Sequence, residues 1–164
     1  MTSHAEELRR AMRQWATGVT VVSVYHDGQH HGMTVSSFTS LSLEPALVLI
    51  SLEQVTKTHK LVQAAGTFAV TILGQHMQDV SDTFAGRVSD IEDRFAGLET
   101  FTLITGAPLL TSGLAWFDCR VVATYPAGTH TVYIGEVLQA KTNTRIEETP
   151  LLYYDRGYRR MDSG

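Results

Sequence analysis

The sequence predicts a mainly β protein, an antiparallel barrel with short α-helices at its periphery. Six or seven segments rich in β-branched and aromatic residues lie between turns, and only two or three short stretches have helical spacing. Strands and helices do not alternate regularly, as they do in the βαβ units of a parallel sheet. No repeat or linker divides the chain, so we expect residues 1–164 to form a single domain.

The first 38 residues predict a helix followed by a β-hairpin. Ser3 and Glu6 form a capping-box pattern. An apolar stripe at helical spacing follows, and a glycine is positioned to end the helix; these residues are Leu8, Met12, Trp15 and Gly18. Residues 19–38 read as two strands joined at Asp27-Gly28, because this dipeptide favours the positive φ angles of a tight turn.

The middle of the chain predicts two strands, each followed by a helix. The expected strands are residues 46–53 and 67–73, and the expected helices are residues 56–66 and 76–86. Thr56 is a typical N-cap and Gly66 a typical C-cap for the first of these helices.

The last third predicts two long strands and leaves one region open. Residues 98–105 are open between strand and loop, and 106–113 read as a loop. Residues 114–125 alternate, with Phe117, Cys119, Val121 and Ala123 on one side and Asp118 and Arg120 on the other. Residues 130–142 predict another strand with a bulge at Gly135, and residues 150–161 close the chain.

Composition excludes several classes of protein. The longest apolar runs fall well short of a membrane span, and the N-terminus has no apolar signal segment, which favours a cytoplasmic protein without membrane contact. A lone cysteine, Cys119, rules out an internal disulfide and is expected to be a small buried side chain. The net charge of −4 and the lack of a long basic cluster disfavour nucleic acid as a partner.

Neither a metal site nor a serine nucleophile is predicted. His30 and His31 are neighbours on one strand, so they point to opposite faces and cannot bind one metal ion together. No HExxH or GxSxG pattern occurs, and Ser36 and Ser37 lack the flanking glycines of a nucleophile elbow.

Three positions could serve an anionic or ring-shaped ligand. Lys57 and Arg87 each stand at a helix end, where free amides and a cation suit a phosphate, although ordinary helix capping explains the same pattern. His130 enters a strand after the turn-forming residues 125–128, at the rim of the expected barrel, where a surface turn histidine would be equally ordinary.

Residues 34–42 contain six hydroxyl side chains, more than a core strand normally carries. Thr34 and Ser36 share one face of their strand, while Val35 and Ser37 share the other. This pattern fits a half-solvated edge strand. It also fits a polar wall for a flat ring with hydrogen-bonding edges and a polyol chain, such as the isoalloxazine and ribityl groups of a flavin.

Sequence blocks along nearly the whole chain resemble the short-chain NAD(P)H:flavin oxidoreductases, the reductase components of two-component flavin-dependent monooxygenases. The blocks are WATGVTVVSV, GMTVSSFTSLSLEPALVLISL, FAVTILG, DTFAG, AGTHTVYIGEV and PLLYYDRGYRRM, in the family's order. The resemblance implies an FMN-binding split barrel, and a homodimer with flavin at the subunit interface.

The resemblance also implies site residues. Flavin would lie along the backbone and hydroxyls of Met33, Thr34, Val35, Ser36 and Ser37, continued by Ser51 and Leu52. The phosphate-binding turn would be Thr56, Lys57 and Thr58, with a loop near the flavin tail at Phe84, Ala85, Gly86 and Arg87. His130 matches the family histidine beside the nicotinamide. The chain departs from the family at Thr129, where an acidic residue is common, and at Ala46, where a second proline often follows Pro45.

The implied activity is hydride transfer from NADH or NADPH to FMN, with FAD possible, and delivery of the reduced flavin to a separate oxygenase. A flavin carrier without NAD(P)H turnover is the alternative. A related pyridoxamine phosphate oxidase is disfavoured, because no second basic cluster for a substrate phosphate is found.

Overall fold

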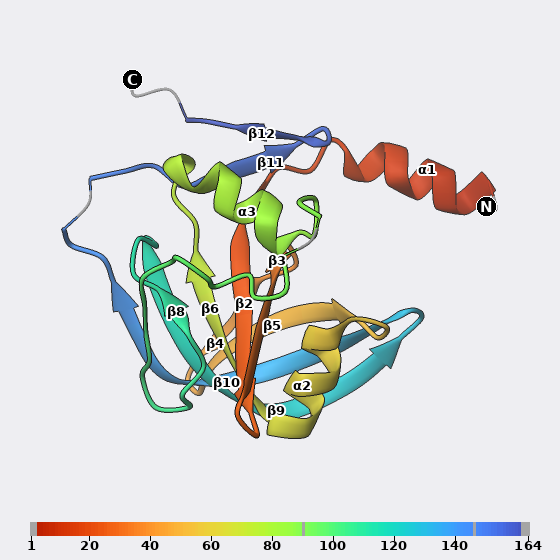
Figure 1. Cartoon of the computed structure of the whole chain (residues 1–164). Helices are drawn as coiled ribbons and strands as arrows, with labels where there is room; N and C mark the ends of the chain where they lie inside the picture. Colours follow the sequence, from red (N-terminus) through yellow and green to blue (C-terminus); the bar gives the residue numbers. More distant parts are fainter. Residues whose placement is uncertain (1–2, 90, 146, 162–164) are drawn as a thin grey trace.

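The computed structural model describes residues 3–89, 91–145 and 147–161 (Figure 1). A seven-stranded antiparallel sheet forms its centre, with the strands in the order β3-β2-β6-β9-β10-β5-β4. The bounds are β2 (Thr20–His26), β3 (Gln29–Val35), β4 (Thr39–Leu43), β5 (Ala46–Glu53), β6 (Thr67–Ile72), β9 (Ala115–Ala127) and β10 (His130–Thr142).

The sheet curls so that its two ends meet. Ser37, just after β3, donates its hydroxyl to the carbonyl of Ser51 on β5 at 2.9 Å and accepts the Ser51 N–H at 3.1 Å. Because β3 is an edge strand and β5 lies next to the opposite edge, this pair joins the far ends of the sheet. The arrangement is the antiparallel barrel that the sequence predicts.

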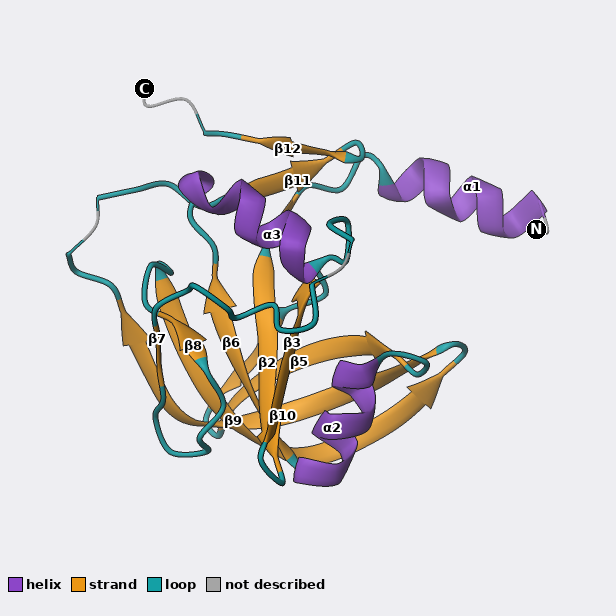
Figure 2. Cartoon of the chain, viewed as in Figure 1, coloured by secondary structure: helices purple, strands orange, loops and turns teal. Residues whose placement is uncertain are grey.

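Short elements surround the sheet, and Figure 2 shows the helices on its outside. The helices are α1 (Ser3–Met12), α2 (Lys57–Ala65) and α3 (Gln78–Phe84), with a 3-10 turn η1 (Gln75–Met77) before α3. The minor strands are β1 (Thr17–Gly18), β7 (Thr100–Phe101), β8 (Leu109–Leu110), β11 (Leu152–Tyr154) and β12 (Gly157–Arg159). The hairpin β11–β12 also pairs with β1.

Several local predictions are confirmed. Asp27 and Gly28 have φ angles of 47° and 78° and join β2 to β3 in a two-residue turn. Thr56 caps α2 by accepting the N–H of His59, and Gly66 ends the helix with φ of 67°. The register of β10 against β9 shifts at Gly135, as expected of a bulge.

The barrel interior is filled by apolar side chains from β2, β5, β6 and β10. Fully buried examples are Val22, Ile50, Leu52, Phe68 and Val70. Cys119 lies among them, and burial raises the pKa of its thiol to about 12. The prediction of a small buried side chain is therefore confirmed.

The structure corrects the prediction for the N-terminal helix. Helix α1 ends at Met12, six residues before Gly18, and contains no buried residue. Its apolar stripe, extended by Trp15, is more than half exposed, and Figure 1 shows α1 projecting away from the barrel. Helical spacing was present, but the barrel of this chain provides no surface against which the stripe packs.

The structure also corrects the placement of Asp118. Its side chain is completely buried, although the alternation put it on the polar side of β9. The carboxylate accepts the N–H groups of Ile104 and Thr105 at 2.6 and 2.8 Å, because the loop between β7 and β8 folds over this face. Residues 98–113 form only the two-residue strands β7 and β8. Strand β8 lies within residues 106–113, which the sequence predicted to be a loop.

Candidate functional site

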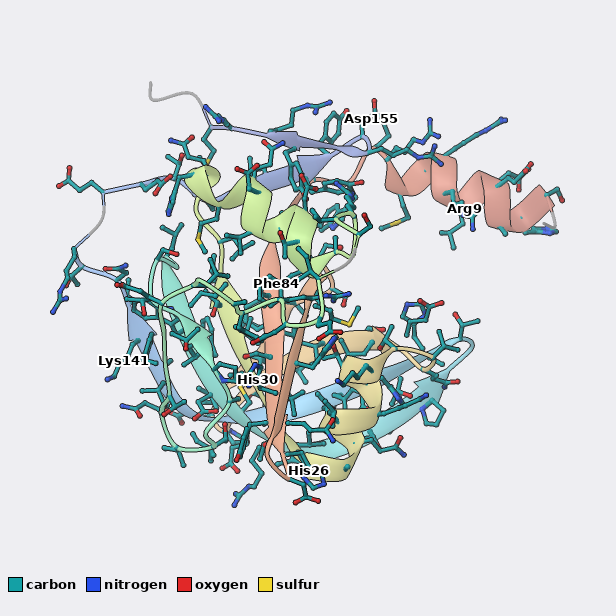
Figure 3. The ribbon with its side chains drawn as sticks, in the orientation of Figure 1. Arg9, His26, His30, Phe84, Lys141 and Asp155 are labelled. Atoms are coloured by element: carbon teal, nitrogen blue, oxygen red, sulfur yellow. The ribbon has the colours of Figure 1, made fainter. Side chains whose placement is uncertain are left out.

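A cavity of about 550 Å³ opens beside β3, bordered by α2, α3 and the hairpin β11–β12. Phe84, which is buried, lies between α3 and the sheet (Figure 3) and lines the cavity. Many of the predicted flavin-contact residues line this cavity: Met33, Thr34, Ser36, Thr56, Lys57, Thr58, Phe84, Ala85 and Arg87. The chain thus brings together three segments that are far apart in the sequence.

The N-terminus of α2 forms one cationic wall of the cavity. The Thr56 hydroxyl accepts the N–H of His59 at 3.2 Å and donates to the carbonyl of Glu53 at 2.8 Å, which fixes the first turn. The N–H groups of Lys57 and Thr58 lie in this turn and have no acceptor within the helix. Together with the Lys57 ammonium group they form a seat suited to a phosphate.

A second cationic wall lies where α3 ends. Arg87 Nη1 donates to Asp82 Oδ1 at 2.8 Å, and this bond raises the pKa of the guanidinium above its usual value. The main chain of α3 also fixes the predicted polar wall, because the Thr34 hydroxyl donates to the carbonyl of Ser81 at 2.6 Å. Thr34 therefore has a fixed position at the cavity edge.

Arg94 and His31 are among the cavity residues that were not predicted from the sequence. Arg94 reaches in from the loop after α3 and donates to the carbonyls of Gly32 and Phe84 at 3.0 and 2.9 Å. His31 lies 2.8 Å from the Thr58 hydroxyl. Burial, followed by the charges of nearby cations, lowers the pKa of His31 to about 4, so its ring is neutral at pH 7.

The other predicted flavin residues lie beside this cavity rather than in its lining. The side chains of Val35 and Leu52 are buried in the barrel core, so they can contribute only their main-chain groups. Ser37, paired with Ser51, lines a neighbouring hollow of about 530 Å³. Gly86 follows α3 with a φ of 70°, a conformation that glycine adopts readily.

His130 lies at the exposed turn between β9 and β10, one strand away from the cavity. It is directly opposite Glu53 in the pairing of β10 with β5, and Glu53 lines the cavity. Its Nδ1 atom is 2.9 Å from the hydroxyl of Thr129, and its carbonyl accepts an N–H of Gln54 at 3.0 Å. A hydroxyl, rather than a carboxylate, therefore contacts the His130 ring from the preceding residue.

Over residues 3–89, 91–145 and 147–161, no group of three or more His, Cys, Asp or Glu side chains is arranged to hold a metal ion. Within the same ranges, no helix has the length and apolar character needed to span a membrane.

A family model described as the flavin reductase like domain matches residues 12–162. The chain belongs to this family. The match includes every segment that borders the cavity, from Val19 before β2 to strand β12.

Relatives of known activity match the chain along most of its length. The NADH-dependent flavin reductase StyB of Pseudomonas fluorescens is 37% identical over 151 residues, which cover 92% of this chain and 86% of the relative. The reductase component of 4-hydroxyphenylacetate 3-monooxygenase from Thermus thermophilus is 35% identical over 156 residues, or 95% and 96% of the two chains.

Solved structures of flavin reductases share the fold. The NADH:FAD oxidoreductase SgcE6 of Streptomyces globisporus, in complex with NAD and FAD fragments, superposes with a TM-score of 0.87 at 32% identity, covering 97% of this chain and 93% of the other. The styrene monooxygenase flavin reductase of Pseudomonas putida superposes with a TM-score of 0.83 at 34% identity, covering 96% of this chain and 98% of the other. The predicted antiparallel FMN-binding split barrel is confirmed.

Proposed function

We propose that this chain is a flavin reductase that transfers a hydride from NADH to FMN or FAD and supplies the reduced flavin to a separate monooxygenase. The observation that carries the proposal is the cavity in which a hydroxyl-rich strand faces two cationic walls. The relatives named as NADH-dependent flavin reductases and as monooxygenase reductase components favour this activity over that of a flavin carrier.

The residues of the cavity fit a flavin phosphate and its sugar chain. Lys57 and the first N–H groups of α2 would bind the phosphate from one side, and Arg87 and Arg94 would add positive charge from the other. Thr34 and Ser36 line the same cavity, and their hydroxyls would face a ribityl chain bound there. Backbone groups of 33–37 and of Ser51 and Leu52 would meet the edge of the ring.

Bound flavin supplies a hydride acceptor, and a nicotinamide nucleotide supplies the hydride. The chain needs only to hold the two rings in contact and to keep water away from the reaction, so paired acids and bases are not required. Thr34, bonded to the carbonyl of Ser81, and the neutral His31, bonded to the hydroxyl of Thr58, would give the bound flavin a fixed wall. His130, at the rim next to Glu53, would orient the nicotinamide as a positioning residue.

Anaerobic mixing of the purified protein with FMN and NADH tests the proposal. Loss of the visible absorbance of oxidised flavin, with many flavin molecules reduced per protein, is the expected result. Flavin that binds without being reduced would identify a carrier instead. The same experiment with FAD in place of FMN, and with NADPH in place of NADH, defines the preferred flavin and nucleotide.

We also propose a homodimer that completes the flavin site. Apolar side chains that are exposed in the single chain support this proposal, among them Leu8, Met12 and Trp15 around α1, and Val122 and Tyr125 on β9. Sedimentation at several protein concentrations, with and without FMN, is the test. Flavin and self-association should strengthen each other because the two equilibria are linked. A flavin-bound monomer would refute the shared site.

Two further parts of the proposal concern the whole chain. Residues 1–164 form a single flavin reductase-like domain, which the match over residues 12–162 supports. The protein works in the cytoplasm, where NADH is regenerated, and cell fractionation with an antibody against the chain tests this location.

A further inference from the structure

Tyr158 of strand β12 lines the cavity beside α3, and its hydroxyl both donates and accepts hydrogen bonds. It donates to Asp82 Oδ1 at 2.9 Å and lies 2.8 Å from the hydroxyl of Ser81. Because a tyrosine hydroxyl has one proton and that proton is given to Asp82, the Ser81 hydroxyl must be the donor in the second bond. Arg87 Nη1 supplies a longer contact to the same oxygen at 3.4 Å.

The position of Tyr158 is fixed by its hairpin rather than by a ligand. Tyr158 stands directly opposite Tyr153 in the β11–β12 pairing, and the two rings meet edge to face with their centroids 5.7 Å apart. Both tyrosines line the cavity. The C-terminal hairpin therefore presents a rigid aromatic surface to the end of α3.

Arg87 is the side chain that this aromatic surface restrains. Half of it is exposed, and a long exposed arginine samples many rotamers unless contacts restrain it. The Tyr158 ring lies 5.5 Å from the guanidinium carbon, and Asp82 Oδ1 accepts hydrogen bonds from Tyr158 and from Arg87.

We propose that Tyr158 is a positioning residue that holds Arg87 at the flavin phosphate and thereby makes the site selective for phosphorylated flavins. This inference rests on the proposed function, because it needs flavin to occupy the cavity. Without the Tyr158 hydroxyl, Asp82 and the Arg87 bound to it are free to turn away from the cavity. The phosphate then loses the Arg87 guanidinium as a partner, while the flavin ring keeps all of its contacts.

The test compares FMN with riboflavin, which lacks the phosphate, in equilibrium titrations of Tyr158→Phe followed by flavin fluorescence. We expect about a tenfold loss of FMN affinity, since a hydrogen bond to a charged network is lost, and less than a twofold change for riboflavin. Tyr154→Phe is the matched control. It removes a hydroxyl from the same hairpin, but that hydroxyl donates to Gln14 and does not line the cavity.

Two further variants separate positioning from a general structural role. In an Arg87→Ala background, Tyr158→Phe should cost no further FMN affinity, because the two residues act as a unit. Ser81→Ala, which removes the donor to Tyr158, should cause a smaller loss that is again specific for FMN. It replaces Tyr158→Phe if that variant does not fold.

Equal losses for FMN and riboflavin in Tyr158→Phe, or additive losses in the double variant, would overturn the inference. So would an Arg87→Ala variant with unchanged FMN affinity. Failure of the proposed function gives a different result, because the unmodified protein would then either bind no flavin or bind flavin without reducing it with NADH.

Discussion

The phosphate seat at the start of α2 predicts that Lys57→Ala weakens FMN binding while leaving riboflavin binding nearly unchanged. Lys57 is the first residue of α2 and lines the cavity. Its replacement removes one cation but leaves the Thr56 cap and the N–H groups of the first turn in place, because these depend on Thr56 and the main chain. The perturbation is thus confined to one charge.

The expected magnitude follows from the kind of contact that is lost. A hydrogen bond to a charged group contributes about 1–3 kcal/mol, which is roughly a 5- to 150-fold change in Kd. The lower part of this range is expected, because the Lys57 side chain is exposed and Arg87 and Arg94 still line the cavity. Riboflavin should change by less than about 0.5 kcal/mol.

Fluorescence titrations of both flavins at low and moderate salt provide the measurement. Lys60→Ala is the matched control, since Lys60 lies on the same helix and is exposed but does not line the cavity. Equal losses for FMN and riboflavin, or an equal effect of Lys60→Ala, would refute the assignment of the phosphate to this helix end.

The remaining predictions concern the rim, the cavity and the core. His130→Ala should bind FMN nearly normally but lose roughly ten- to a hundredfold in anaerobic reduction by saturating NADH, measured by stopped flow; an unchanged rate would make it an ordinary turn residue. His31 has its pKa lowered from 6.5 to about 4, so the unfolded chain binds more protons between these values and stability must fall as the pH drops through this window. In urea unfolding at several pH values, His31→Asn should reduce this loss of stability between pH 6.5 and 4. The same pH dependence in the variant and the unmodified protein would contradict a neutral His31 ring in the folded chain. Gly135→Ala places a methyl group 2.5 Å from the buried ring of Phe68 and should cost about 1–3 kcal/mol in thermal unfolding, whereas Gly18→Ala, with open space around it, should cost far less.

Elements with strong local chemistry could be predicted from the sequence. The turn at Asp27-Gly28 and the caps of α2 at Thr56 and Gly66 depend on residues within a few positions of each other. Their backbone preferences act before any tertiary contact forms. The long alternating strands were equally clear, because a half-buried sheet requires that pattern.

Contacts between distant segments escaped prediction. Arg94 enters the cavity by binding the carbonyl of Gly32, 62 residues earlier, and Tyr158 meets Ser81 across 77 residues. No sequence pattern near Arg94 or Tyr158 indicates a site residue, since both look like exposed loop or edge-strand positions. Asp118 was misplaced for the same reason, because a loop from another part of the chain covers the side of β9 that alternation assigns to solvent.

The strand order has a consequence for how the protein is made. Strand β5 ends at Glu53, yet its neighbour β10 starts only at His130, so the barrel stays open until most of the chain has left the ribosome. Pairings over such separations close large loops, and proteins dominated by them fold slowly. During that interval β5 is paired only with β4, and its apolar residues are available for aggregation. Abundant production of this chain should therefore depend on chaperones more than production of a helical protein of equal length.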